Sequence, residues 1–205
     1  TEGIRVGESA KVTNIGGSKT TGNTISASTG IGIYAGASNV TNISHNKIEQ
    51  TGSTSIRVVN AASKTKITSN TISNGKERGI YVSGSEIAIT SNKINKSAAT
   101  AIQVENGKGT IRKNTVKTTL SGDGILVSGK ANISSMNENT VTSAKKNGIE
   151  VSGKAAVKYI GEKKKTGNTI DKAGVNGIYV KEGTNVSNIC YNTVKSSKSA
   201  NINAE

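Results

Sequence analysis

One triplet recurs along the whole chain and constrains its fold more than any other feature. The triplet Asn-(Thr/Lys)-(Ile/Val) occurs eight times, once every 22 to 29 residues. Its asparagines are Asn23, Asn46, Asn70, Asn92, Asn114, Asn139, Asn168 and Asn192. A repeat of this length indicates a solenoid, in which each repeat forms one coil that packs against its neighbours.

Two further apolar motifs recur once in most repeats, at similar spacings to the triplet. The first is a small residue followed by Ile-x-Val, or by Ile-x-Ala in one coil, and its isoleucines are Ile4, Ile33, Ile56, Ile80, Ile102, Ile125, Ile149 and Ile178. The second is an apolar residue three positions before most of the asparagines, as in Ile43, Ile67, Ile89, Ile111, Met136 and Ile189. Short runs that alternate apolar and polar residues are typical of strands.

We therefore predict an all-β solenoid of about eight coils, with three parallel sheets and almost no helix. The Ile-x-Val isoleucines should form one interior stack. The apolar residues that close the triplets should form another: Ile25, Ile48, Ile72, Ile94, Val116, Val141, Ile170 and Val194. Successive coils should lie about 4.8 Å apart.

A longer repeat is superimposed on the coils. Residues 1–39 align without gaps to residues 146–184, and both segments carry extra residues before the asparagine, at 16–22 and 161–167. We interpret residues 1–205 as a single domain, made of a six-coil unit (1–145) and the start of a second unit (146–205). The chain is expected to be a segment of a longer array. It begins and ends within recognisable repeats, so we also predict uncapped ends and end-to-end self-association.

The order Asn-Thr-Ile, turn, Gly-Ile-x-Val, turn, Ile-x-x-Asn resembles the right-handed parallel β-helix repeats of the pectin-lyase-like superfamily. The resemblance covers essentially the whole chain, and it implies a right-handed helix in a secreted or cell-surface protein. It also implies that each asparagine makes a tight turn, in the left-handed region, and bonds to the next coil. The superfamily includes lyases, hydrolases and adhesins, so it does not specify a function.

The titratable residues argue against catalysis by this chain alone. Acid–base sites need clustered carboxylates, but Asp123 and Asp171 are the only aspartates and fall on different coils. The glutamates are scattered. His45 and Cys190, each the only one of its kind, should lie six coils apart, about 29 Å. We predict no catalytic residue, no metal and no cofactor, and we lean toward a protein that is not an enzyme.

The formal net charge of +14 favours an anionic partner. Few aromatic residues accompany the lysines, so no nucleic acid is expected. No apolar stretch is long enough to span a membrane. The x residue of Ile-x-Val should point outward and form a row along the rod. Leu126 and Glu150 interrupt this row, whose candidate binding residues are Arg5, Tyr34, Arg57, Tyr81, Gln103 and Tyr179. Tyrosine and arginine can hold acidic sugars by ring stacking and by charge-assisted bonds.

Three functions remain open at this point. The first is a structural or adhesive segment of a secreted or cell-surface protein, without catalytic activity of its own. The second is a module that binds an acidic polysaccharide or another cell-wall polymer. The third is a fragment of a polysaccharide lyase or hydrolase whose catalytic coils lie outside this chain.

Overall fold

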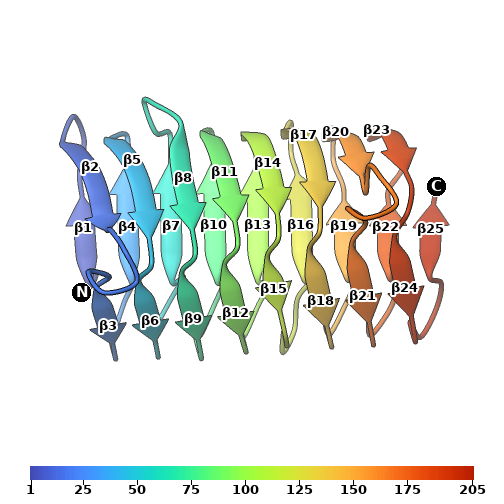
Figure 1. Cartoon of the computed structure of the whole chain (residues 1–205), viewed down its shortest axis with the longest axis horizontal. Coiled ribbons are helices and arrows are strands. Elements are labelled where there is room, and N and C mark those ends of the chain that lie inside the picture. Colours follow the sequence, from blue (N-terminus) through green and yellow to red (C-terminus); the bar gives the residue numbers. More distant parts are fainter.

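A computed structural model describes all 205 residues as a rod of stacked coils, built from 25 short strands and no helix. The strands belong to three parallel sheets, and each coil adds one strand to each sheet. The two termini lie at opposite ends of the rod (Figure 1). The predicted all-β solenoid with three parallel sheets is confirmed.

Sheet A contains nine strands: β1 (Ile4–Val6), β4 (Ile33–Gly36), β7 (Ile56–Val59), β10 (Ile80–Ser83), β13 (Ile102–Glu105), β16 (Ile125–Ser128), β19 (Ile149–Val151), β22 (Ile178–Val180) and β25 (Ile202–Ala204). Sheet B contains eight strands: β2 (Lys11–Gly16), β5 (Asn39–Ser44), β8 (Thr65–Thr68), β11 (Glu86–Thr90), β14 (Lys108–Arg112), β17 (Asn132–Asn137), β20 (Ala156–Ile160) and β23 (Asn185–Ile189). Sheet C contains eight strands: β3 (Thr24–Ser26), β6 (Lys47–Glu49), β9 (Thr71–Ser73), β12 (Lys93–Asn95), β15 (Thr115–Val116), β18 (Thr140–Thr142), β21 (Thr169–Asp171) and β24 (Thr193–Lys195). Eight coils are complete, and β25 begins a ninth.

The interior is formed by the predicted apolar columns. In sheet A, the Ile-x-Val isoleucines pair from Ile4 through Ile178 and on to Ile202. In sheet C, the column runs from Ile25 to Val194. Side chains in the central coils are fully buried, whereas Ile4 and Val194 in the outermost coils are only partly covered. Stacking identical branched side chains replaces the globular core that this composition lacks.

The third column, in sheet B, is more regular than the sequence pattern indicated. Ile15 pairs with Ile43, and Met136 pairs with Ile160, so every coil contributes one residue to the column. The motif spacing missed Ile15 and Ile160 because extra residues separate them from their asparagines. Those residues form the long dark-blue and orange connections from β2 to β3 and from β20 to β21 (Figure 1).

The eight asparagines form a continuous ladder, as predicted. The Oδ1 of Asn70 accepts from the backbone N–H and from the side-chain amide of Asn46, and Asn92 receives the same pair of bonds from Asn70. The Asn70 Nδ2 also donates to the carbonyl of Ile43 in the preceding coil. The pattern runs from Asn23 to Asn192. It satisfies polar groups that burial would otherwise leave without partners.

The expected left-handed conformation of these asparagines is wrong. In coils without the extra loop, the residue before the asparagine has the positive φ instead, as in His45 (57°) and Ser69 (57°). In the two coils with a loop, Gly16 (80°) and Gly161 (74°) take it. The preceding residue turns the chain from sheet B toward sheet C, and this leaves the asparagine side chain directed inward, where its partners are.

Candidate functional site

The six predicted binding residues lie in one row on the outer face of sheet A. Parallel register places Arg5 beside Tyr34, Tyr34 beside Arg57, and Arg57 beside Tyr81. The row continues from Tyr81 through Gln103, Leu126, Glu150 and Tyr179 to Asn203. A parallel sheet therefore presents one of these side chains about every 4.8 Å.

Cations stack on the tyrosine rings of this row. The Arg5 guanidinium lies 4.6 Å from the Tyr34 ring centre. Two guanidinium groups approach the Tyr81 ring, that of Arg57 at 5.6 Å and that of Arg78 at 5.1 Å from the ring centre. Arg78 was not predicted as a site residue because it precedes β10 and is not part of the row. It is nonetheless tied to the row, since its Nε donates to Gln103 at 2.6 Å.

Glutamates engage several polar groups of the same face. The Tyr81 hydroxyl donates to Glu105 at 2.6 Å, and burial together with this bond raises the pKa of Tyr81. The Tyr179 hydroxyl donates to Glu205 at 2.8 Å, and that bond is the main reason why the pKa of Tyr179 is raised. Arg5 forms an ion pair with Glu2 at 2.9 Å. The face is thus of mixed charge rather than uniformly basic.

Two carboxylates that looked dispersed in the sequence meet around one amide. The backbone N–H of Asn147 donates to Asp123 at 2.9 Å, and its Nδ2 donates to Glu150 at 2.7 Å. Glu150 also pairs with Lys181 at 3.4 Å. Burial raises the pKa of Asp123, which is 4 % exposed, and the nearby charge of Glu150 raises it further. Sequence spacing hid this cluster because its members are separated by one coil.

The Asp123 cluster is part of a second, shorter ladder. Asp123 accepts from Asn147, and the Asn147 Oδ1 accepts from the backbone and side chain of Asn176. These residues occupy the same position in successive coils, directly before the glycine that precedes each Ile-x-Val isoleucine. Their bonds hold adjacent coils together. Both carboxylates are therefore engaged by the framework of the rod.

His45 and Cys190 lie at equivalent turns, directly after β5 and β23. These strands are six steps apart in sheet B, or about 29 Å. The Cys190 Sγ donates to the Gly161 carbonyl at 3.2 Å, as the Ser44 hydroxyl donates to Gly17 at 3.2 Å. Cys190 thus occupies the place that serine takes in coil 2, and His45 is not near enough to act as its base.

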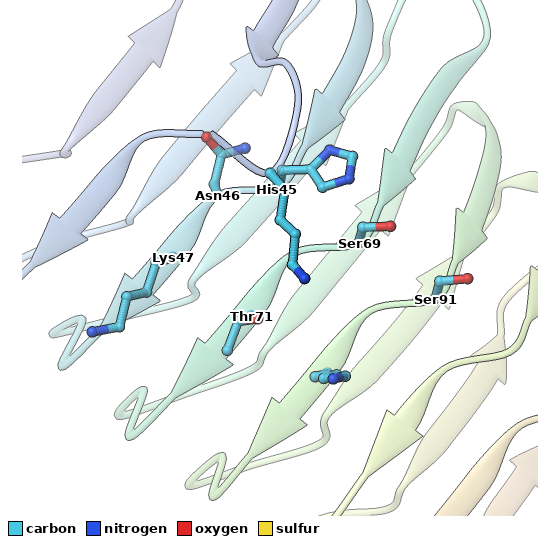
Figure 2. A pocket seen from close by; sticks show the side chains of 8 residues that line it. His45, Asn46, Lys47, Ser69, Thr71 and Ser91 are labelled. Carbon is cyan, nitrogen blue, oxygen red and sulfur yellow. The ribbon is translucent and has the colours of Figure 1, made fainter. Parts of the chain in front are cut away.

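A hollow that the sequence did not indicate lies at the turns between sheets B and C. It has a volume of about 540 Å³, and no hydrophobic residue lines it. The lining residues are Lys19, His45, Asn46, Lys47, Ser69, Thr71, Ser91 and Lys93. Figure 2 shows His45, Ser69 and Ser91 on three successive turns, with Lys47 extending away from the imidazole ring. No motif could have indicated this hollow, because Lys19 reaches it from the extra loop of coil 1.

The comparison with protein families decides the assignment. A family model described as right handed beta helix region matches residues 2–163. This chain belongs to the right-handed β-helix family. The resemblance drawn from the repeat motifs is thereby confirmed, and so is the right-handed parallel fold. Searches of curated proteins and of solved structures found no match to this β-helix.

The β-helix has neither a cluster of metal ligands nor a membrane-spanning helix. No group of three or more His, Cys, Asp or Glu side chains is arranged to hold a metal ion. The structure also contains no helix that is long and apolar enough to cross a membrane.

Proposed function

We propose that this chain is a structural or adhesive segment of a secreted or cell-surface β-helix protein, with no catalytic activity of its own. The observation that carries the proposal is the asparagine ladder. Its eight asparagines, six of them buried, join one coil to the next from Asn23 to Asn192. A rod held in this way presents fixed rows of side chains to a partner.

The placement of the carboxylates supports this proposal. Asp123 and Glu150 are held by Asn147, and Glu105 accepts from Tyr81. General acid and base groups must be free to reach a substrate. Here these three carboxylates bond to neighbouring residues of the rod.

The test combines adhesion with catalysis. The purified chain is incubated with insoluble bacterial cell walls and, separately, with soluble polygalacturonate and alginate. We expect it to sediment with the cell walls and to release no new reducing or unsaturated sugar ends. Cleavage of a polymer that a single substitution abolishes would favour the third function, a lyase or hydrolase fragment. Failure to sediment with any wall material would contradict the adhesive role.

A second candidate function is binding of an anionic polysaccharide along the row on sheet A. The specific observation in its favour is that Arg57 and Arg78 both lie over the ring of Tyr81. Two guanidinium groups gathered around one ring can bond to the carboxylates of an acidic sugar, and the ring gives the sugar an apolar edge to pack against. The internal bonds to Glu105 and Gln103 compete with a ligand, so the affinity should be modest and should fall with added salt.

A matched pair of double variants tests this candidate. Tyr81→Ala with Arg57→Ala removes one ring and one charge from the row. Lys158→Ala with Tyr159→Ala removes a similar pair, at 5.3 Å, from β20 on sheet B. We expect polygalacturonate binding at low salt to weaken about fivefold or more in the first variant only. An equal loss of affinity in both variants would exclude the row as the binding site. Binding of polygalacturonate no stronger than that of a neutral glucan would exclude it as well.

A further inference from the structure

The hollow between sheets B and C exists because of one column of side chains. In coils 2 to 4 the residue before the ladder asparagine has a positive φ, and these three residues, His45, Ser69 and Ser91, all line the hollow. In the next coil the column contains Lys113. Two short serines thus lie between two larger side chains and form the floor of a depression.

The depression is basic and polar. Its lining contains three lysines and three hydroxyl groups, but no carboxylate and no apolar side chain. Lys47 is engaged by Glu49 at 2.9 Å. Lys19 and Lys93 form no ion pair, so their charges are not neutralised by the protein. An uncompensated pair of ammonium groups beside hydroxyl donors favours an anion.

His45 adds an unsatisfied group to the same place. Its Nδ1 is buried and has no hydrogen-bond partner, and its half-buried ring makes no side-chain hydrogen bond to the protein. Buried polar atoms without a partner are rare in proteins, and each one calls for a reason. The ring borders the hollow beside Ser69 (Figure 2).

The geometry points to an oxyanion-binding site in this hollow, for a phosphate, sulfate or carboxylate group that is either free or carried by a sugar. Lys19 and Lys93 supply charge, and the hydroxyls of Ser69, Thr71 and Ser91 supply neutral donors. A volume of about 540 Å³ accommodates a group larger than a bare anion. The site is independent of the row on sheet A, since its residues lie on the turns between sheets B and C and on sheet C.

The internal duplication of the chain provides a matched control. Residues 16–22 and 161–167 form equivalent loops, so Lys164 stands in coil 7 where Lys19 stands in coil 1. Lys195 is an exposed lysine on β24 of sheet C. Lys19→Ala with Lys93→Ala therefore removes the same charge as Lys164→Ala with Lys195→Ala, but only the first pair alters the hollow.

Calorimetric titration at low salt tests the site with inorganic phosphate, glucose 6-phosphate and glucose. We expect the two phosphates to bind and glucose not to bind. Tighter binding of glucose 6-phosphate would assign a sugar-borne anion, and equal binding would assign a free one. The Lys19/Lys93 variant should weaken binding at least tenfold, and the Lys164/Lys195 variant less than twofold. Circular dichroism verifies that both variants keep their strands.

Two results would overturn the site. The first is phosphate binding no stronger than glucose binding in the unaltered chain. The second is an equal loss of phosphate affinity in both double variants, which would show that the net charge of the chain alone attracts the anion. Ser91→Asp is a further check, because it adds a negative charge to the floor at a half-buried turn residue. It should abolish phosphate binding, and retained binding would place the anion elsewhere.

Discussion

The Oδ1 atom of Asn70 accepts two hydrogen bonds from the same residue one coil away, from the backbone N–H and the Nδ2 of Asn46, both at 3.0 Å. Because the Asn70 Nδ2 donates in turn to Ile43 and to Asn92, one side chain contacts both adjacent coils. Because of these contacts, we expect single substitutions in the ladder to lower the free energy of unfolding strongly even when they leave the apolar core intact.

Asn70→Ala should destabilise the rod by about 3 kcal/mol, because it leaves a buried N–H and a buried carbonyl without partners. The measurement is the midpoint of urea unfolding. Asn95→Ala is the control, because Asn95 is exposed at the end of β12 and should change the midpoint little. Equal shifts in the two variants would contradict a structural role for the ladder.

Gly109→Ala should destabilise the rod by about 1–3 kcal/mol, because the site requires a backbone that L residues rarely adopt. Gly109 has φ +140°, and an added Cβ would collide with the carbonyl oxygen of Ile87. At Gly7 an added Cβ meets nothing within 4 Å. Gly7→Ala should therefore be close to neutral in the same urea titration. A neutral Gly109→Ala would show that β14 can shift to relieve the strain.

Asp123→Asn should stabilise the protein at neutral pH. Burial and Glu150 raise the pKa of Asp123 above its ordinary value of 3.8, so between the unfolded and the folded pKa the folded protein binds more protons than the unfolded chain. The stability linked to this group is therefore present at low pH and is lost as the pH rises through the folded pKa. Asparagine avoids that loss and matches Asn147 and Asn176 in the same column.

The gain in the urea midpoint from Asp123→Asn should be largest near pH 7 and should disappear below about pH 4. Unfolding curves across this pH range provide the test. A gain that is independent of pH would mean that the benefit comes from the amide's hydrogen bonds rather than from the removal of a buried charge.

Self-association should be detectable by sedimentation velocity at high protein concentration. The terminal strands β1 and β25 each have only one paired edge, and such edges recruit further strands. Ile202→Lys should reduce the association by placing a charge on β25. Leu120→Lys is a matched control, because both side chains are 50 % exposed and Leu120 lies on a turn in the middle of the rod. Equal effects would indicate a lateral contact instead.

The sequence predicted those features that every coil repeats. The stacked isoleucines were found because identical coil positions must share one packing environment, and the ladder asparagines were found for the same reason. Ile15 and Ile160 were not recognised as members of the sheet B column, because the extra loops changed their spacing from the asparagines. The turn residue with the positive φ was not predicted, because its identity varies from His45 to Ser69 to Glu138.

The candidate sites were harder to predict, because they depend on neighbours in other coils. Register alone was enough to place Tyr34, Arg57 and Tyr81 in one row. It could not show that Glu105 accepts from Tyr81, or that Asp123 meets Glu150 around Asn147. The hollow was harder still to predict, because it depends on the path of the loop that carries Lys19.

The ladder also determines the order in which the rod can come apart. An inner asparagine such as Asn92 bonds to the coil before it and to the coil after it. The terminal ones, Asn23 and Asn192, have a ladder neighbour on one side only. An inner coil that opened alone would break both sets of bonds at once. Unfolding of this 205-residue chain should therefore begin at its first or last coil and spread inward.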